Sequence, residues 1–238
     1  MNFSNLYVNG ASHTKFGDHK LWPEHLAEHY NINLENQAHQ GKTVESILTQ
    51  TINDLDKHTP QETLVVLHLP TTTVRQCWYR IDDKQISEVP VTIWQMPEPQ
   101  KIWKIYYTQI TNDFDMYAKW LLQILNIQNF LKVNNFFYHI IFDNTEFYHD
   151  GKTRTYLEEV DLDIQKVEYR DDPVFNKFKN IRHKHIENAN ITSGITKWFE
   201  KNCEKDWCLD GVHWNSQAHQ KFVQELLVKN INRCLCLD

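Results

Sequence analysis

Two residues near the C-terminal end have the types and the spacing of an acid–base pair. Asp210 and His213 stand three residues apart in a short loop, directly before an apolar periodicity that predicts a helix over 216–229. In such a loop an aspartate can orient a histidine and stabilise its charged form, so that the histidine acts as a general base. The pair needs a nucleophile, and the best candidate is Ser12, close to the other end of the chain.

Together these residues predict the chemistry of a serine hydrolase. His213 would take the proton from Ser12, while Asp210 would fix the tautomer of His213 and stabilise the imidazolium. The oxyanion that forms would be received by the backbone amides of Ser12 and Gly41. A side-chain amide could add a further donor there.

The apolar pattern of the chain predicts the sheet that must position these residues. Short apolar runs alternate with helical periodicities, as in an open α/β fold with a parallel sheet covered on both faces. The expected strands are 5–9, 32–34, 64–69 and 136–142, and the expected helices are 23–30, 43–55, 112–131, 192–202 and 216–229. We expect Ser216 to cap the last helix.

Ligands of open α/β sheets bind outside the carboxyl ends of the strands. The expected strands end at Ser12, at the Asn36–Gly41 loop, at the Thr71–Arg75 loop and at Asp143. The loop with Asp210 and His213 is expected in the same layer. We therefore expect all these segments to meet at one edge of the sheet.

Residues 76–105 interrupt the alternation of strands and helices. They contain three tryptophans and three prolines among short apolar runs, which indicates an inserted β-hairpin or a lid. The prediction is one domain over 1–238 with an insertion at about 76–105.

The motifs resemble a known family. The stretch from Asn9 to Thr14 resembles the first block of the SGNH (GDSL-like) hydrolases, especially its phage-encoded variant, and the stretch from Asn36 to Gly41 is similar to the second block. Asp210 and His213, followed by a tryptophan and an asparagine, resemble the fifth block. The resemblance implies a three-layer flavodoxin-like fold with a parallel sheet flanked by helices. It also implies hydrolysis of an ester or O-acetyl group without a cofactor, and the spacing of the cysteines matches no metal site.

The third block departs from the family pattern. The family places an asparagine after the third strand as an oxyanion donor, whereas this strand continues into His68-Leu69-Pro70 and a run of threonines. The donor would have to come from Thr71, Thr72 or Arg75. Asn36 is a further candidate for binding the oxyanion or the substrate, although a turn-forming role fits it better.

The charge and the apolar content of the sequence argue against some classes of binding partner. A net charge of -6 argues against a general nucleic-acid binder, and no apolar run approaches the length of a membrane span. The first ten residues lack the features of a signal peptide. Five cysteines fit no closed disulfide framework, so free thiols in a reducing compartment are expected. We expect a cytoplasmic or virion-associated protein that acts on a small-molecule or carbohydrate ester.

Two other hypotheses stay open. The chain could be a structural or interaction protein, such as a phage virion component, that keeps the SGNH fold with a decayed site. It could also be a carbohydrate-binding module that uses Trp78, Trp94 and Trp103 to stack on sugar rings. The residues leave open whether the chain forms a homo-oligomer or a virion assembly.

Overall fold

The computed structural model describes residues 3–70, 75–82, 85–92, 113–143, 188–210 and 213–235, with single positions at 173, 177 and 180. The chain forms two compact units. The first consists of Met1–Thr71, Ile127–Thr145 and Glu187–Asp238, and the second of Thr72–Asn126 and Glu146–Ile186. Ser12, Asp210 and His213 all belong to the first unit.

The first unit is built on a five-stranded parallel sheet in the order β2-β1-β3-β6-β7. The strands are β1 (Asn5–Gly10), β2 (Asn33–Asn36), β3 (Thr63–Leu69), β6 (Phe137–Phe142) and β7 (Ile191–Ser193). Because β1 and β3 are neighbours, Gly10 is paired with His68 at the carboxyl end of both strands. The predicted parallel sheet is confirmed.

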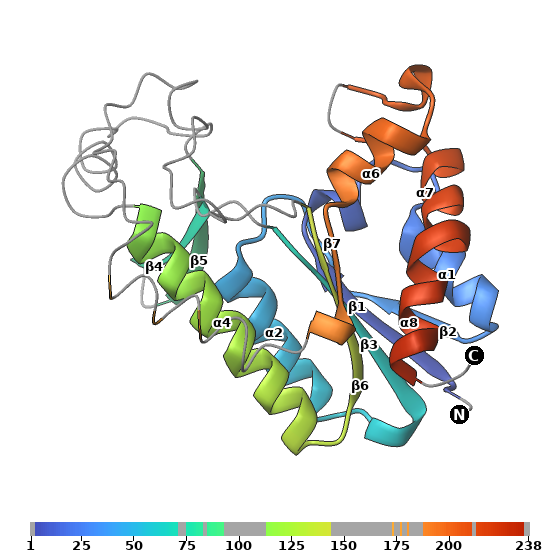
Figure 1. Cartoon of the computed structure of the whole chain (residues 1–238). Helices are drawn as coiled ribbons and strands as arrows, with labels where there is room; N and C mark the ends of the chain where they lie inside the picture. Colours follow the sequence, from blue (N-terminus) through green and yellow to red (C-terminus); the bar gives the residue numbers. More distant parts are fainter. Residues whose placement is uncertain are drawn as a thin grey trace. The chain divides into compact units, whose positions relative to one another are not determined.

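Helices cover both faces of this sheet (Figure 1). One face carries α1 (Trp22–Tyr30), α6 (Ile195–Asn202) and the C-terminal helix. That last helix consists of α7 (Ser216–Phe222), a π-helical turn (Val223–Leu227) and α8 (Val228–Leu235). The other face carries α2 (Val44–Leu55) and the last turns of α4 (Asp113–Val133). The three-layer α/β arrangement is therefore as predicted.

Alternation along β1 divides its side chains between the two layers. Leu6 and Val8 are fully buried in the core that includes α1 and the C-terminal helix. Asn9 is equally buried but belongs to the opposite layer, where its amide donates to the α2 carbonyl of Ile47 at 3.2 Å. A period of two along a buried strand produces this division.

Two local predictions were wrong in detail. The cap of the C-terminal helix is Asn215 rather than Ser216, because the Asn215 Oδ1 accepts from the Ala218 N–H at 3.1 Å. The helix expected over 192–202 begins only at Ile195, since the residues before it form β7 at the edge of the sheet. The left-handed backbone of Gly194 (φ 78°) separates these two elements.

The second unit contains an antiparallel hairpin of β4 (Arg75–Asp82) and β5 (Gln85–Thr92). This hairpin falls in the segment that we predicted as an insertion. The segments of the unit, Thr72–Asn126 and Glu146–Ile186, extend beyond the predicted boundaries of 76–105.

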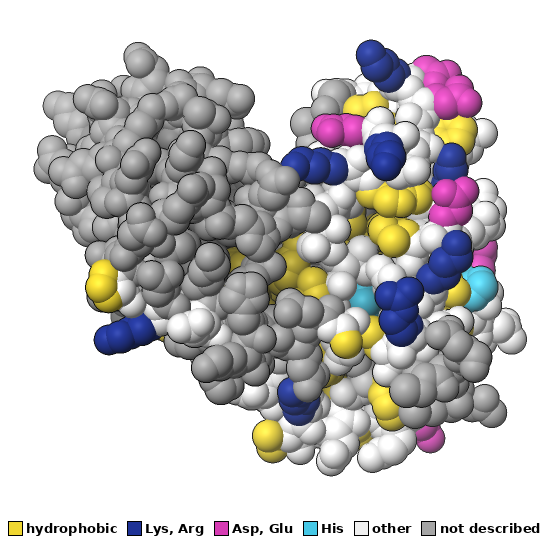
Figure 2. Space-filling view, in the orientation of Figure 1, with side chains coloured by type: hydrophobic (Ala, Val, Ile, Leu, Met, Phe, Trp, Pro, Cys, Tyr) yellow, Lys and Arg dark blue, Asp and Glu magenta, His cyan; other side chains and the backbone are white. Residues whose placement is uncertain are grey.

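The described surface carries charges of both signs. On the face drawn in Figure 2, basic and acidic side chains are interspersed over the described part of the chain. Within that part, none of the helices combines the length and the apolar character needed to cross a membrane.

Candidate active site

Asp210 holds His213 through two hydrogen bonds from one carboxylate. Its Oδ2 accepts from the His213 Nδ1 at 2.7 Å, and its Oδ1 accepts from the His213 backbone N–H at 2.7 Å. The loop is closed by a bond of 2.7 Å from the Leu209 N–H to the His213 carbonyl, and by the capping of α7 at Asn215. Both the ring and the backbone of His213 are therefore fixed by the residue three positions before it.

The second ring nitrogen of His213, Nε2, can take part in proton transfer. Since Nδ1 carries the proton that is donated to Asp210, the neutral ring has a lone pair on Nε2. Nε2 is buried and has no hydrogen-bond partner in the described part of the chain, while the side chain as a whole is 16% exposed. An imidazole in this state can accept a proton from a hydroxyl group.

Ser12 lies in a turn that packs against His213. It opens a 3₁₀ turn, Ser12–Thr14, directly after β1, and it is half-buried. His13 and Phe16, which follow it closely, both contact the imidazole of His213, with ring centroids at 5.2 and 3.7 Å respectively. The structure thus brings together the turn with the predicted nucleophile and the predicted base from opposite ends of the sequence.

Gly10 permits this turn for a steric reason. A Cβ added there would lie 2.5 Å from the Thr14 Oγ1 and 2.9 Å from the His68 Cβ. Only glycine allows Thr14 and the neighbouring strand to approach β1 so closely.

The second-block loop is held by its own hydrogen bonds. Asn36 donates to the Thr14 carbonyl at 3.2 Å and accepts from the Ala38 N–H at 3.0 Å, so its side chain joins this loop to the Ser12 turn. Gly41 has φ 79°, a left-handed conformation, and open space where a Cβ would stand. In the described part of the chain, the backbone N–H groups of Ser12 and Gly41 donate to no other residue. Both are available to a ligand.

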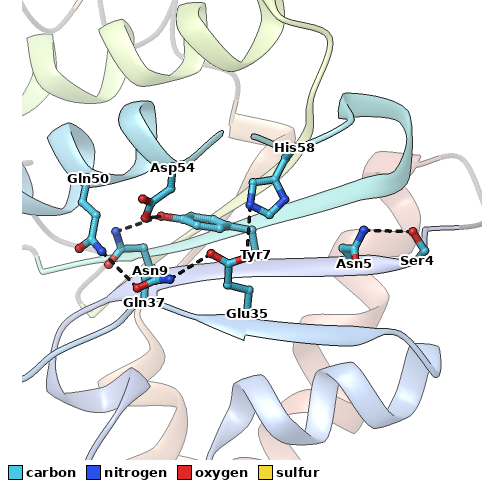
Figure 3. A network of polar contacts seen from close by, with 9 residues as sticks. All are labelled: Ser4, Asn5, Tyr7, Asn9, Glu35, Gln37, Gln50, Asp54 and His58. Atoms are coloured by element: carbon cyan, nitrogen blue, oxygen red, sulfur yellow. Dashed lines mark hydrogen bonds and ion pairs between the residues drawn. The ribbon is translucent and has the colours of Figure 1, made fainter. Parts of the chain in front are cut away.

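A polar network anchors this loop to the sheet and to α2. Figure 3 shows part of it: Gln50 donates to Gln37, and Asn9 lies beside Tyr7. The Lys42 ammonium donates to the Asn9 Oδ1 at 3.0 Å, to the Gln37 carbonyl at 2.6 Å and to the Gln50 Oε1. Lys42 therefore connects Asn9 on β1 with the second-block loop and with α2.

The phenol of Tyr7 belongs to the same network and donates to the Asp54 Oδ2 at 3.0 Å. Burial, with the nearby Asp54 carboxylate, raises the pKa of Tyr7 well above its usual range. The hydroxyl therefore stays protonated and keeps donating to Asp54.

The carboxyl ends of β3 and β6 contribute a pair that we did not predict from the sequence. The His68 Nε2 donates to the Asp143 Oδ1 at 2.7 Å, and its Nδ1 is 2.8 Å from the Thr14 hydroxyl. His68 and Thr14 are fully buried. The available signal was a histidine and an aspartate at the ends of two strongly apolar strands, where buried polar groups need partners.

Two predicted site residues receive no placement. Thr71 lies outside the described residues. Arg75 begins β4 in the second unit, and its side chain lies outside the described part. Among the described residues, no group of three or more His, Cys, Asp and Glu side chains could hold a metal ion.

Two buried histidines of the first unit have lowered pKa values. Burial, together with the neighbouring imidazoles of His13 and His19, lowers the pKa of His219 well below its usual value. On the far part of the sheet, burial lowers the pKa of His139 to about 3. Both rings are held neutral by the fold.

Solved structures are similar to this chain over nearly its whole length. The crystal structure of TesA has a TM-score of 0.52 at 9% identity, and the match covers 97% of this chain and 99% of TesA. The psychrotrophic esterase EstA from Pseudoalteromonas sp. has a TM-score of 0.50 at 12% identity, covering 98% and 99%. A member of the lipolytic G-D-S-L family from Veillonella parvula has a TM-score of 0.47 at 14% identity, covering 94% and 98%.

These likenesses concern the fold. The chain has the α/β fold of the SGNH (GDSL-like) hydrolases, as its motifs predicted, and the likeness to the phage-encoded variant stays a prediction. No family model matches the sequence, and no curated protein matches it either.

Proposed function

We propose that this chain is a serine hydrolase that cleaves an ester or O-acetyl group. Ser12 is the nucleophile, His213 the general base and Asp210 the residue that orients the base. The observation that carries the proposal is the Asp210–His213 pair with an unpartnered, buried Nε2, packed against the Ser12 turn through Phe16 and His13. The fold shared with an esterase structure supports the same class of reaction.

The reaction proceeds in two halves. The Ser12 Oγ attacks the carbonyl carbon while its proton passes to the His213 Nε2, and the oxyanion forms between the N–H groups of Ser12 and Gly41. The imidazolium then gives that proton to the leaving alkoxide, which leaves an acyl-serine. In the second half a water molecule loses its proton to Nε2 and attacks the acyl carbon, and Ser12 is released as the hydroxyl.

Asp210 contributes in both halves. Its carboxylate keeps the proton on Nδ1 while the ring is neutral and stabilises the imidazolium after proton transfer. Its Oδ1 holds the His213 backbone and its Oδ2 holds the ring, so the ring cannot turn away without breaking the Nδ1 bond at 2.7 Å.

With the backbone N–H groups of Ser12 and Gly41 as its two oxyanion donors, the site should hydrolyse esters at a modest rate. The asparagine expected after the third strand is absent, and the described end of that strand places His68 in a bond with Asp143 instead. Losing one oxyanion donor costs a factor of about 100 to 1,000 in rate. We therefore expect slow turnover of activated esters.

The missing donor also favours the second candidate, a protein that keeps this fold for assembly or interaction. The carbohydrate-binding hypothesis rests on Trp78, Trp94 and Trp103, whose side chains lie outside the described residues. Both candidates predict a serine that is not activated.

Labelling with a fluorophosphonate probe tests the proposal, with turnover of p-nitrophenyl acetate measured beside it. The wild type should be labelled and should turn over the ester, and both signals should vanish in Ser12→Ala with an unchanged Tm. Ser4→Ala is the matched control, because Ser4 is exposed and lies just before β1, at the other end of that strand. An unlabelled wild type, or a labelled Ser12→Ala variant, would refute the proposal and favour a decayed site.

A further inference from the structure

A buried chain of three polar side chains runs behind the Ser12 turn. Asp143, at the end of β6, accepts from the His68 Nε2 at 2.7 Å, and the His68 Nδ1 is 2.8 Å from the Thr14 Oγ1. Because the carboxylate only accepts, the proton of neutral His68 is on Nε2, and Nδ1 accepts from the Thr14 hydroxyl. The hydrogen bonds therefore run in one direction: Thr14 donates to His68, and His68 donates to Asp143.

Thr14 is the point at which three segments meet. Its hydroxyl is bonded to β3, its carbonyl accepts from Asn36 in the second-block loop at 3.2 Å, and its N–H donates to the Ala11 carbonyl at 3.0 Å. The last bond, with that from the Lys15 N–H to the Ser12 carbonyl at 3.1 Å, closes the turn that contains Ser12. The Thr14 hydroxyl therefore ties the closed turn to the central strands of the sheet.

We infer that the buried Asp143–His68–Thr14 chain positions the nucleophile turn, so that His68 and Thr14 act as positioning residues for Ser12. The inference rests on the proposed function. His68 and Thr14 are fully buried, so water cannot replace the bond between them, and losing it leaves an unsatisfied nitrogen inside the protein. The fit of Gly10 against both Thr14 and His68 shows that the turn is packed directly on this bond.

The Asp143–His68–Thr14 hydrogen bonds lie at the end of β3, the strand after which the family places its third-block donor. At the end of β3 this sequence has a histidine whose two nitrogens are both used within the protein. The histidine therefore acts through the turn rather than on the substrate. A change of about 1 Å in the position of a reacting group can reduce the rate about 100-fold, so a loosened turn should be visible in kcat.

The sharpest variant is Thr14→Val, which keeps the shape of the side chain and removes the hydroxyl. Thr14→Ser keeps the hydroxyl and is the rescue variant. Thr192→Val is the matched control, because Thr192 is also buried and bonded to a buried histidine, His139, at 2.7 Å, but lies away from Ser12 on β7. We expect kcat for p-nitrophenyl acetate to fall about tenfold or more in Thr14→Val with KM within about twofold. Thr14→Ser should retain most of kcat, and Thr192→Val should lose stability but not kcat.

Amide hydrogen exchange of the same variants gives a readout that does not need activity. The N–H groups of Thr14 and Lys15 should exchange faster in Thr14→Val than in the wild type or in Thr192→Val. An active wild type with unchanged kcat in Thr14→Val, or with equal losses in Thr14→Val and Thr14→Ser, would overturn the inference and leave the hydrolase proposal intact. If the wild type is inactive, the hydrolase proposal fails, and exchange alone decides: faster exchange supports the positioning role, whereas equal exchange overturns it.

Discussion

The ring of Phe16 lies parallel to the imidazole of His213, with the two centroids 3.7 Å apart and the planes 6° apart. The two residues are far apart in the sequence, and Phe16 follows Ser12 by four positions. Stacking restrains a face of the His213 ring, whereas Asp210 binds the edge of the ring at Nδ1. It also offers an aromatic face to the positive charge that His213 carries after proton transfer.

Replacing Phe16 should therefore slow the chemical step. An aromatic face contributes about 0.5–1 kcal/mol to an exposed cation, which corresponds to a loss of about two- to fivefold in kcat/KM for Phe16→Ala. Phe3→Ala is the control, since Phe3 packs edge-on against Phe137 at the opposite end of the strands from Ser12. Steady-state kinetics with p-nitrophenyl acetate should show the loss in Phe16→Ala only, and equal kcat/KM in both variants would contradict the role of the stack.

Asp210→Asn should disable the base while leaving the loop formed. The asparagine oxygen can still accept from the His213 N–H, but its amide would then donate to Nδ1 and move the ring proton to Nε2, where it blocks the acceptance of the Ser12 proton. We expect kcat to fall about 10⁴-fold, which is the loss typical of a catalytic histidine held in the wrong tautomer. Turnover and Tm should be measured together, and a variant that keeps wild-type kcat would exclude Asp210 from the mechanism.

Gly41→Ala tests the second oxyanion donor through the backbone. Gly41 has φ 79° and open space at the position of the added methyl group, so alanine would strain the backbone without a clash. Gly194→Ala is the matched control, because Gly194 has nearly the same φ, 78°, and lies between β7 and α6. Both variants should lose about 1–2 kcal/mol of stability. Only Gly41→Ala should also lower kcat, and parallel losses of kcat in both would argue against Gly41 as a donor.

Stability should fall as the pH drops below about 6.5, the usual value for histidine. Burial lowers the pKa of His139 to about 3, so the unfolded chain binds a proton in this range and the folded chain does not. The stabilisation is complete above the unfolded pKa and is lost as the pH falls towards 3. Between pH 7.5 and 5.5 His139 alone should account for roughly 1 kcal/mol of the free energy of unfolding.

His219, whose pKa is also lowered by burial, adds to the same trend. Urea unfolding at several pH values should show a smaller pH dependence in His139→Gln than in the wild type. His39→Gln, at an exposed position, should leave the dependence unchanged. Equal pH dependence in wild type and His139→Gln would contradict the expected role of the buried imidazole.

Local sequence was sufficient for most of the elements, though not for β7, and for the two ends of the site. The apolar run at β3 could be assigned because a strand buried on both faces needs nearly continuous apolar residues. Asp210 and His213 could be paired because three positions within one loop already bring a carboxylate to an imidazole. Ser12 could be proposed because a nucleophile at the carboxyl end of a strand follows from parallel topology.

The other features of the site could not be predicted, because they depend on contacts between segments that are far apart in the sequence. The bond from Thr14 through His68 to Asp143 requires β1, β3 and β6 to be neighbours in register, and nothing local to any of these residues encodes that order. The stack of Phe16 on His213 likewise exists only once the two ends of the chain fold together. Sequence alone thus determined the residue types that can do chemistry and the elements that carry them. The tertiary structure decided which side chains meet, because buried polar groups take partners from whichever strands the sheet brings beside them.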